Sequence, residues 1–206
     1  MPSTLQALKR HQAALRACRR CPDMIPPVVV GRPVLSPIIS IGQAPGEREG
    51  AAGKPFAWTA GKTLFKWFER LGVDETRYRE RVYMAAVCRC FPGKNPRGGD
   101  RVPDRREIDN CRPWLEREFH LLRPQLVIPI GKLAINEILH APRLADVVGR
   151  VFETSLFGVD TTVIPLPHPS GASTWHRTEP GRTLLHEALE HIGRHPAWQA
   201  TFAEED

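Results

Sequence analysis

Four short apolar runs, separated by segments with helical periodicity, are the feature that most constrains the fold of this chain. The runs cover about residues 38–41, 82–87, 126–130 and 162–166, and they are rich in β-branched side chains. Uniformly apolar runs of this length are typical of strands buried on both faces of a sheet. Strands that alternate with helices predict an α/β fold built on a parallel sheet with right-handed crossovers.

The segments between these runs carry apolar side chains at helical spacing. They cover residues 64–71, 108–122, 133–139 and 181–192. Gly72 and Pro124 stand where the first two of these helices are expected to end. In open parallel sheets, ligands bind beyond the carboxyl ends of the strands. The loops that follow the runs, which contain GQAPG, CRCFPG, Gly131 and HPSG, are therefore where a site is expected.

Length indicates a single domain, and the net charge favours a polyanionic partner. The chain has 206 residues, a net charge of +6 and a pI near 9.4, and we expect one domain over residues 1–206. A basic chain favours a partner such as nucleic acid. The N-terminus is a basic amphipathic pattern without an apolar core, and no apolar run is long enough to span a membrane. We expect a cytoplasmic protein, and a monomer.

The loop after the first run has a composition typical of loops that line a ligand-binding pocket. It covers residues 42–61, GQAPGEREGAAGKPFAWTAG, and its five glycines let the backbone approach a ligand closely. Pro45 and Pro55 limit the shapes that the loop can adopt. Phe56 has no apolar partner at strand or helix spacing, so its flat ring is available to stack on a flat ligand.

A histidine stands where the last apolar run ends. The segment TTVIPLP is followed by His168, Pro169 and Ser170, which places His168 at the exit of a predicted strand. A hydrogen-bond donor in that position can stabilise negative charge that develops on a ligand. Because both loops follow the carboxyl ends of strands, we expect Phe56 and His168 to face one crevice.

Three segments resemble a known family. GQAPGEREGAAGKPFAWTAGKTLF resembles the first motif of the bacterial and archaeal iron–sulfur uracil-DNA glycosylases, family 4 of their superfamily. HPSGASTWHR resembles the second motif of the wider superfamily, and RPQLVIPIGKLA resembles the strand and helix that precede it. The resemblance covers about residues 18–176. It implies a three-layer α/β/α fold with a four-stranded parallel sheet, and a monofunctional enzyme that hydrolyses the bond between uracil and deoxyribose in DNA.

The cysteines support the same family. Five cysteines in a reducing compartment argue against a disulfide framework and for a metal or cluster site. Two pairs of thiolates suit a [4Fe-4S] cluster, and they also suit tetrahedral zinc. The family order implies four cluster ligands, which are Cys18, Cys21, Cys90 and Cys111. In that order a proline follows the third cysteine within two residues, as Pro92 follows Cys90. Cys88 is the alternative third ligand, but it continues the strand pattern and is expected in the core.

The resemblance also implies roles for residues in the crevice. Phe56 would stack on the extruded uracil, and His168 would donate to the uracil oxygen on which negative charge develops. Further contacts with the base are implied for Gly42, Ala44 and Ser170.

Two residues depart from the family pattern. Gln43 stands where the family has glutamate, and a carboxamide can read an amide edge but cannot act as a general base. The carboxylate that orients the attacking water is then Glu47 or Glu49, of which Glu47 matches the family pattern more closely. Ala86 stands where the family has an asparagine that reads uracil. A glycosylase for another deaminated base is therefore an alternative, as is a non-catalytic nucleic-acid-binding or lesion-sensing protein on the same fold.

Residues near the crevice are candidates for contacts with the DNA backbone. Residues 93–104, GKNPRGGDRVPD, indicate a basic loop inserted between a strand and a helix. Basic and hydroxyl side chains at such a position can bind phosphates. The candidates are Lys94, Arg97 and Arg101 in this loop, and Ser173 and Arg177 after the histidine.

Overall fold

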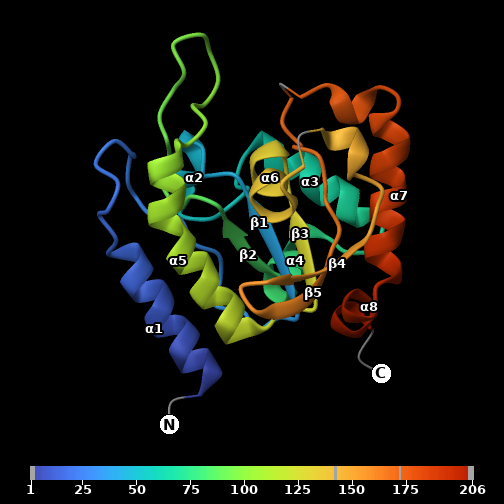
Figure 1. Cartoon of the computed structure of the whole chain (residues 1–206), viewed down its shortest axis with the longest axis horizontal. Coiled ribbons are helices and arrows are strands. Elements are labelled where there is room, and N and C mark those ends of the chain that lie inside the picture. The colour runs from blue at the N-terminus through green and yellow to red at the C-terminus, as the bar shows by residue number, and fades with distance from the viewer. Residues whose placement is uncertain (1–2, 142, 172, 204–206) are drawn as a thin grey trace.

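The computed structural model describes residues 3–141, 143–171 and 173–203, and shows a central sheet covered by helices (Figure 1). The strands are β1 (Ile38–Gly42), β2 (Tyr83–Ala86), β3 (Leu126–Pro129), β4 (Phe152–Leu156) and β5 (Val159–Val163). They lie in the order β2-β1-β3-β5-β4, and every neighbouring pair is parallel except β4 with β5. The α/β fold with a parallel sheet, predicted from the apolar runs, is confirmed.

The expectation of four strands is corrected, because the described part of the chain contains a fifth strand in this sheet. Strand β4 pairs antiparallel with β5 at the edge, and the turn between them has φ angles of 52° at Phe157 and 73° at Gly158. The side chains of β4, FETSL, alternate between partly buried and exposed. An edge strand of this kind lacks the continuous apolar run by which the buried strands were identified.

Helices cover both faces of the sheet, as the three-layer prediction requires. One face packs against α3 (Thr59–Glu69), α4 (Glu75–Arg81), α7 (Gly181–Arg194) and α8 (Pro196–Phe202), and the other against α1 (Thr4–Arg16) and α5 (Arg105–Leu122) (Figure 1). The remaining helices are α2 (Glu47–Ala52), α6 (Lys132–Leu139), and the 3₁₀ turns η1 (Leu144–Asp146) and η2 (Trp175–Arg177). Successive side chains of β1 point to opposite faces of the sheet. Ile38 therefore packs on the face covered by α3, α4, α7 and α8, and Ile39 packs on the face covered by α1 and α5.

Within the described residues, no helix is both long enough and apolar enough to cross a lipid bilayer.

Hydrogen bonds hold the loops at the carboxyl ends of the strands close to one another. Gly42, at the end of β1, is in register with Ala86 at the end of β2, and its carbonyl accepts from the Val87 amide at 2.9 Å. The Gly131 amide, after β3, donates to Leu166 at 2.9 Å. The three strand exits and the segment that leads to the predicted histidine therefore converge at one edge of the sheet.

Candidate active site

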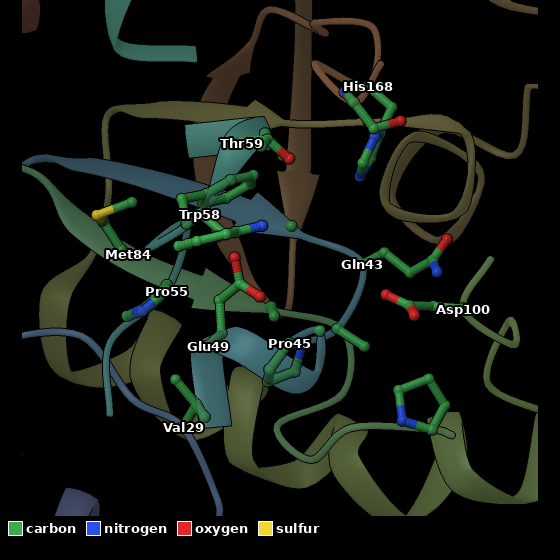
Figure 2. Close-up of a pocket in the computed structure, with 18 of the residues that line it drawn as sticks. Val29, Gln43, Pro45, Glu49, Pro55, Trp58, Thr59, Met84, Asp100 and His168 are labelled. Atoms are coloured by element: carbon green, nitrogen blue, oxygen red, sulfur yellow. The ribbon is translucent and has the colours of Figure 1, made fainter. Parts of the chain in front are cut away.

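A cavity of about 480 Å³ opens at the carboxyl ends of β1 and β2 (Figure 2). This volume lies within the range of small-molecule sites, roughly 300 to 1,000 Å³. The cavity is lined by most of the residues predicted to contact a base: Gly42, Gln43, Ala44, Phe56, Ala86, His168 and Ser170. The fold therefore brings together residues that are far apart in the sequence.

The Phe56 ring lies against the start of the GQAPG loop because residue 42 has no side chain. A Cβ at Gly42 would lie 3.2 Å from both Cε2 and Cζ of the ring, so a larger residue there would push the ring away. Phe56 itself has a φ of 50°, in the left-handed region that residues other than glycine rarely adopt. A residue in that conformation needs support from the structure around it.

Arg79 on α4 supplies that support. Its guanidinium donates to the carbonyl oxygens of Pro55, at 2.8 Å, and of Phe56, at 2.9 Å. Its Nε donates to Glu75 at 2.8 Å, and its Cζ lies 4.6 Å from the centre of the Phe65 ring. Sequence reasoning missed Arg79, because nothing in the segment ETRYRER distinguishes it from its basic neighbours.

His168 points into the cavity (Figure 2) and presents one particular ring nitrogen as a donor. The Ser170 amide donates to Nδ1 at 3.2 Å, so Nδ1 is the acceptor and Nε2 carries the proton of the neutral ring. Burial lowers the pKa of His168 below its ordinary value of 6.5, and His176 lowers it further, whereas the charge of Asp100 acts in the opposite direction. The imidazole is therefore a neutral hydrogen-bond donor at pH 7.

Glu49 and Asp100 are carboxylates that line the cavity. A Cβ at Gly46 would lie 2.8 Å from Glu49 Oε2 and 3.1 Å from Asp100 Oδ2. Because glycine has no side chain, both carboxylates can lie close to the loop at this point. Glu47, which the sequence favoured, lies outside the lining of this cavity. Its side chain is 66% exposed, and its carboxylate is 3.7 Å from the Lys94 ammonium.

Trp58 and Asp100 are among the cavity residues that sequence reasoning missed. Trp58 is 51% exposed, and the Arg48 guanidinium lies 5.2 Å from the centre of its ring. The argument that selected Phe56, an aromatic ring in a glycine-rich loop, applies to Trp58 as well. Asp100 carries no such signal, because its place depends on how the inserted loop folds back.

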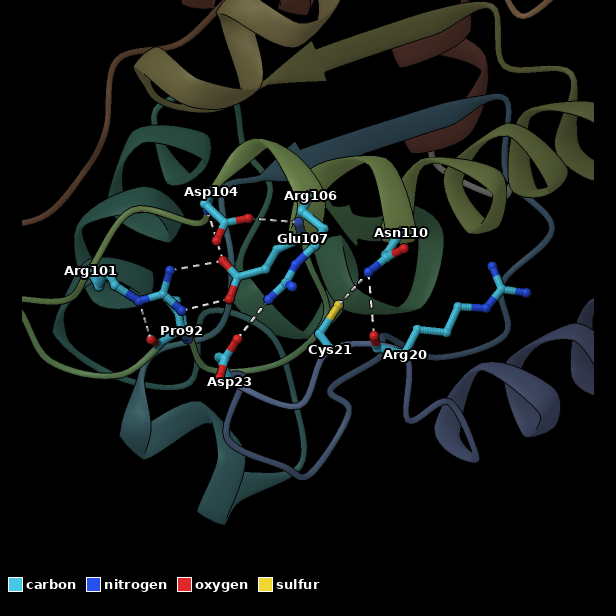
Figure 3. Close-up of polar contacts among 9 residues, drawn as sticks. All are labelled: Arg20, Cys21, Asp23, Pro92, Arg101, Asp104, Arg106, Glu107 and Asn110. Atoms are coloured by element: carbon cyan, nitrogen blue, oxygen red, sulfur yellow. Dashed lines mark hydrogen bonds and ion pairs between the residues drawn. The ribbon is translucent and has the colours of Figure 1, made fainter.

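The predicted phosphate-binding residues of the inserted loop lie in different environments. Arg101 forms hydrogen bonds with the buried Glu107, at 2.7 and 2.8 Å, and with the Pro92 carbonyl at 2.7 Å (Figure 3). Arg101 therefore holds the base of the loop against α5. Arg97, at the tip, has an exposed side chain.

The other two predicted phosphate contacts lie after His168. The Ser173 amide donates to the Ser170 carbonyl at 3.1 Å, and the Arg177 amide donates to Thr174 at 2.9 Å. Both residues therefore belong to tight turns, and the Arg177 side chain is exposed.

Four cysteines line a second, smaller cavity. They are Cys18, Cys21, Cys90 and Cys111. Asn110 approaches this group, with its Nδ2 3.6 Å from Cys21 Sγ (Figure 3), and burial raises the pKa of Cys90 to about 11. Cys88 is fully buried in the core between the sheet and α5, outside the lining of this cavity. In the described part of the chain, no three histidine, cysteine or acidic side chains form a site for a single metal ion.

Comparison with known proteins identifies the superfamily of the chain. Residues 29–192 match the model of the uracil DNA glycosylase superfamily. The chain is 30% identical over 138 residues to a type-4 uracil-DNA glycosylase of Pyrobaculum aerophilum, covering 65% of this chain and 66% of that protein. It is 32% identical over 141 residues to a type-4 uracil-DNA glycosylase of Saccharolobus solfataricus, covering 66% of this chain and 61% of that protein. The chain thus matches less than two thirds of the length of each.

Proposed function

The chain belongs to the uracil-DNA glycosylase superfamily, and on this premise we propose that it hydrolyses the bond between uracil and deoxyribose in DNA. The observation that carries the proposal is that Phe56 and His168 line one cavity beyond the strand ends. Enzymes that act on a base extrude it from the helix and hold it by stacking and by hydrogen bonds to its polar edge. The type-4 relatives are named uracil-DNA glycosylases, and release of uracil by this chain would start base excision repair.

The reaction leaves the electron pair of the broken glycosidic bond on the base. Phe56 stacks on the extruded uracil, and the Nε2–H of His168 donates to the uracil oxygen that becomes negative. Because Nδ1 is held by the Ser170 amide, the ring keeps the required orientation and tautomer. Gln43 lines the same cavity, where its carboxamide can pair with the amide edge of the base.

We also propose that the cysteine cavity holds a [4Fe-4S] cluster. The four thiols surround one cavity, and each iron of such a cluster takes one thiolate. Arg19, Arg20 and Arg89 line the same cavity and would offset part of the negative charge, while Asn110 donates to the Cys21 sulfur. When bound, the cluster would supply a rigid cross-link between three segments of the chain rather than redox chemistry. Zinc is the alternative, for which the thiols of the described chain would have to move closer together around one ion.

Ala86 favours a second candidate, which is the release of a different deaminated base. Its methyl group lines the cavity at the position where the resemblance implies an asparagine. A methyl group cannot form the hydrogen bonds with which an asparagine would select uracil. Hypoxanthine and xanthine are larger bases that also carry a carbonyl and a ring N–H. The preference among these bases therefore depends on Gln43 and the loop amides.

A base-release assay tests the proposed function. Oligonucleotides that carry one uracil, hypoxanthine or xanthine are incubated with the protein, and the free base is measured directly. We expect release of uracil, with the other two bases released more slowly. A protein that binds all three oligonucleotides but releases no base would instead be the lesion-sensing alternative.

The two loop arginines should affect DNA binding differently. We expect Arg97→Ala to reduce the magnitude of the slope of log affinity against log salt by about one unit, because one phosphate contact is lost. Arg101→Ala should change the slope less, since its guanidinium is already paired with Glu107. Arg194→Ala, at the last residue of α7, is the matched control. An unchanged slope in Arg97→Ala would remove the loop tip from the DNA interface.

A further inference from the structure

Hydrolysis requires a group that accepts a proton from the attacking water, and neither Gln43 nor His168 supplies one. The Gln43 carboxamide has no basic lone pair suited to this role. His168 is oriented to donate to the base, with its Nδ1 occupied by the Ser170 amide. The group that accepts the proton is therefore expected to be a carboxylate in the cavity.

The inserted loop carries a carboxylate into the cavity. Its backbone folds back on itself, with the Asn95 amide donating to Gly99 at 2.9 Å and the Arg101 amide donating to Gly93 at 2.8 Å. The ion pair between Arg101 and Glu107 ties this turn to α5. These contacts place Asp100 in the lining of the cavity.

The position of Asp100 suits a base better than the position of Glu49. In the view of Figure 2, the Asp100 carboxylate lies on the side of the cavity that holds Gln43 and His168, whereas Glu49 lies on the opposite side. The charge of Asp100 also acts on the His168 imidazole. The carboxylate and the donor to the base therefore belong to the same part of the cavity.

The Lys94 ammonium lies 2.8 Å from Asp100 Oδ1 and holds the side chain in place. The other oxygen, Oδ2, faces Gly46 of the GQAPG loop. The side chain is 39% exposed, so water can reach the carboxylate. One oxygen is thus fixed by a cation, and the other is directed toward the loop that lines the base site.

We propose that Asp100 is the catalytic base of this enzyme, an inference that rests on the proposed glycosylase function. The oxygen of a water molecule bonds to C1′ of the deoxyribose as the bond from C1′ to N1 of the base breaks. The electron pair of that bond passes to the base, where the hydrogen bond from His168 stabilises it. The water proton passes to Asp100. The inserted loop thereby supplies the carboxylate that residue 43 lacks.

Single-turnover base release, measured with enzyme in excess over a uracil-containing oligonucleotide, tests this assignment. We expect Asp100→Asn to slow release by roughly 10²-fold or more, in the range of general-base effects, with DNA affinity retained. The double variant Gln43→Glu with Asp100→Asn should recover at least about tenfold of that loss, because residue 43 lines the same cavity. Asp109→Asn, an exposed carboxylate on α5, is the matched control and should release uracil at the wild-type rate.

Three outcomes would overturn the assignment. The first is an Asp100→Asn protein that releases uracil at the same rate as an active wild type, a result that would leave the proposed function intact. The second is a loss in Glu49→Gln that exceeds the loss in Asp100→Asn. The third is an equal loss in Lys94→Gln, which removes the ion pair but keeps the carboxylate, because the defect would then be one of loop order. A wild-type protein that releases no base would overturn the proposed function itself, and the inference with it.

Discussion

His168→Ala is expected to slow uracil release by about 10²- to 10³-fold, which corresponds to about 2.7 to 4 kcal/mol of barrier. The histidine donates most strongly when the base carries negative charge, so its loss acts on the transition state and little on DNA binding. The rate of the chemical step should therefore fall while the dissociation constant for DNA stays nearly the same. Single-turnover release and equilibrium binding to the same oligonucleotide measure the two quantities separately.

The protonation state of His168 makes this prediction sharper. Burial lowers its pKa below the ordinary value of 6.5, so the folded protein holds the ring neutral as the pH falls through that value. The contribution of His168 to the rate should therefore stay constant between pH 8 and about 6.5. A wild-type rate that changes near pH 6.5, in a way that His168→Ala abolishes, would contradict a neutral donor.

His186 offers a matched control for the histidine variant. It lies on α7, where its side chain is exposed and hydrogen-bonded to Arg70 at 3.0 Å. His186→Ala removes the same ring and should release uracil at the wild-type rate. Full activity of His168→Ala would mean that the cavity at the strand ends is not where the base is released.

The sequence predicts the part of this site that depends on local pattern. Strand β1 is an unbroken apolar run, and the loop after it carries the glycines and Phe56 that the cavity uses. Helix α2 shows where local pattern fails. It has six residues and no buried side chain, so the sequence contains no apolar stripe that would show whether Glu47 or Glu49 faces the cavity.

Tertiary contacts determine the rest of the site, and the sequence contains no local trace of them. Asp100 lies in the cavity because the ion pair between Arg101 and the buried Glu107 fixes the inserted loop. That pair depends on the position of α5, which carries Glu107. Phe56 keeps its left-handed conformation because Arg79 arrives from α4, more than twenty residues along the chain. In both cases a partly buried ion pair or hydrogen bond, rather than an apolar contact, positions the functional side chain.

The cysteine assignment leads to the second large expected effect, which is loss of the cluster in Cys90→Ser and its retention in Cys88→Ala. Cys90 lines the cavity with the three other candidate ligands, whereas Cys88 is 0% exposed and packs in the core. Removing one of four thiolates leaves an iron without its protein ligand. Removing the Cys88 sulfur leaves a small space in the core and removes a hydrogen bond to the Cys111 thiol, which lowers stability but leaves the four candidate thiolates in place.

Iron, sulfide and zinc analysis of anaerobically purified proteins, with their visible spectra, distinguishes the possible results. We expect about four irons per chain and broad visible absorption for the wild type and for Cys88→Ala, and neither for Cys90→Ser. A colourless wild-type protein with stoichiometric zinc would show that the site holds zinc and not the cluster. Loss of iron in Cys88→Ala together with full iron in Cys90→Ser would reverse the ligand assignment. Because Cys90 lines the cysteine cavity and Pro92, two residues later, lines the base cavity, that reversal would also change the wall of the base cavity.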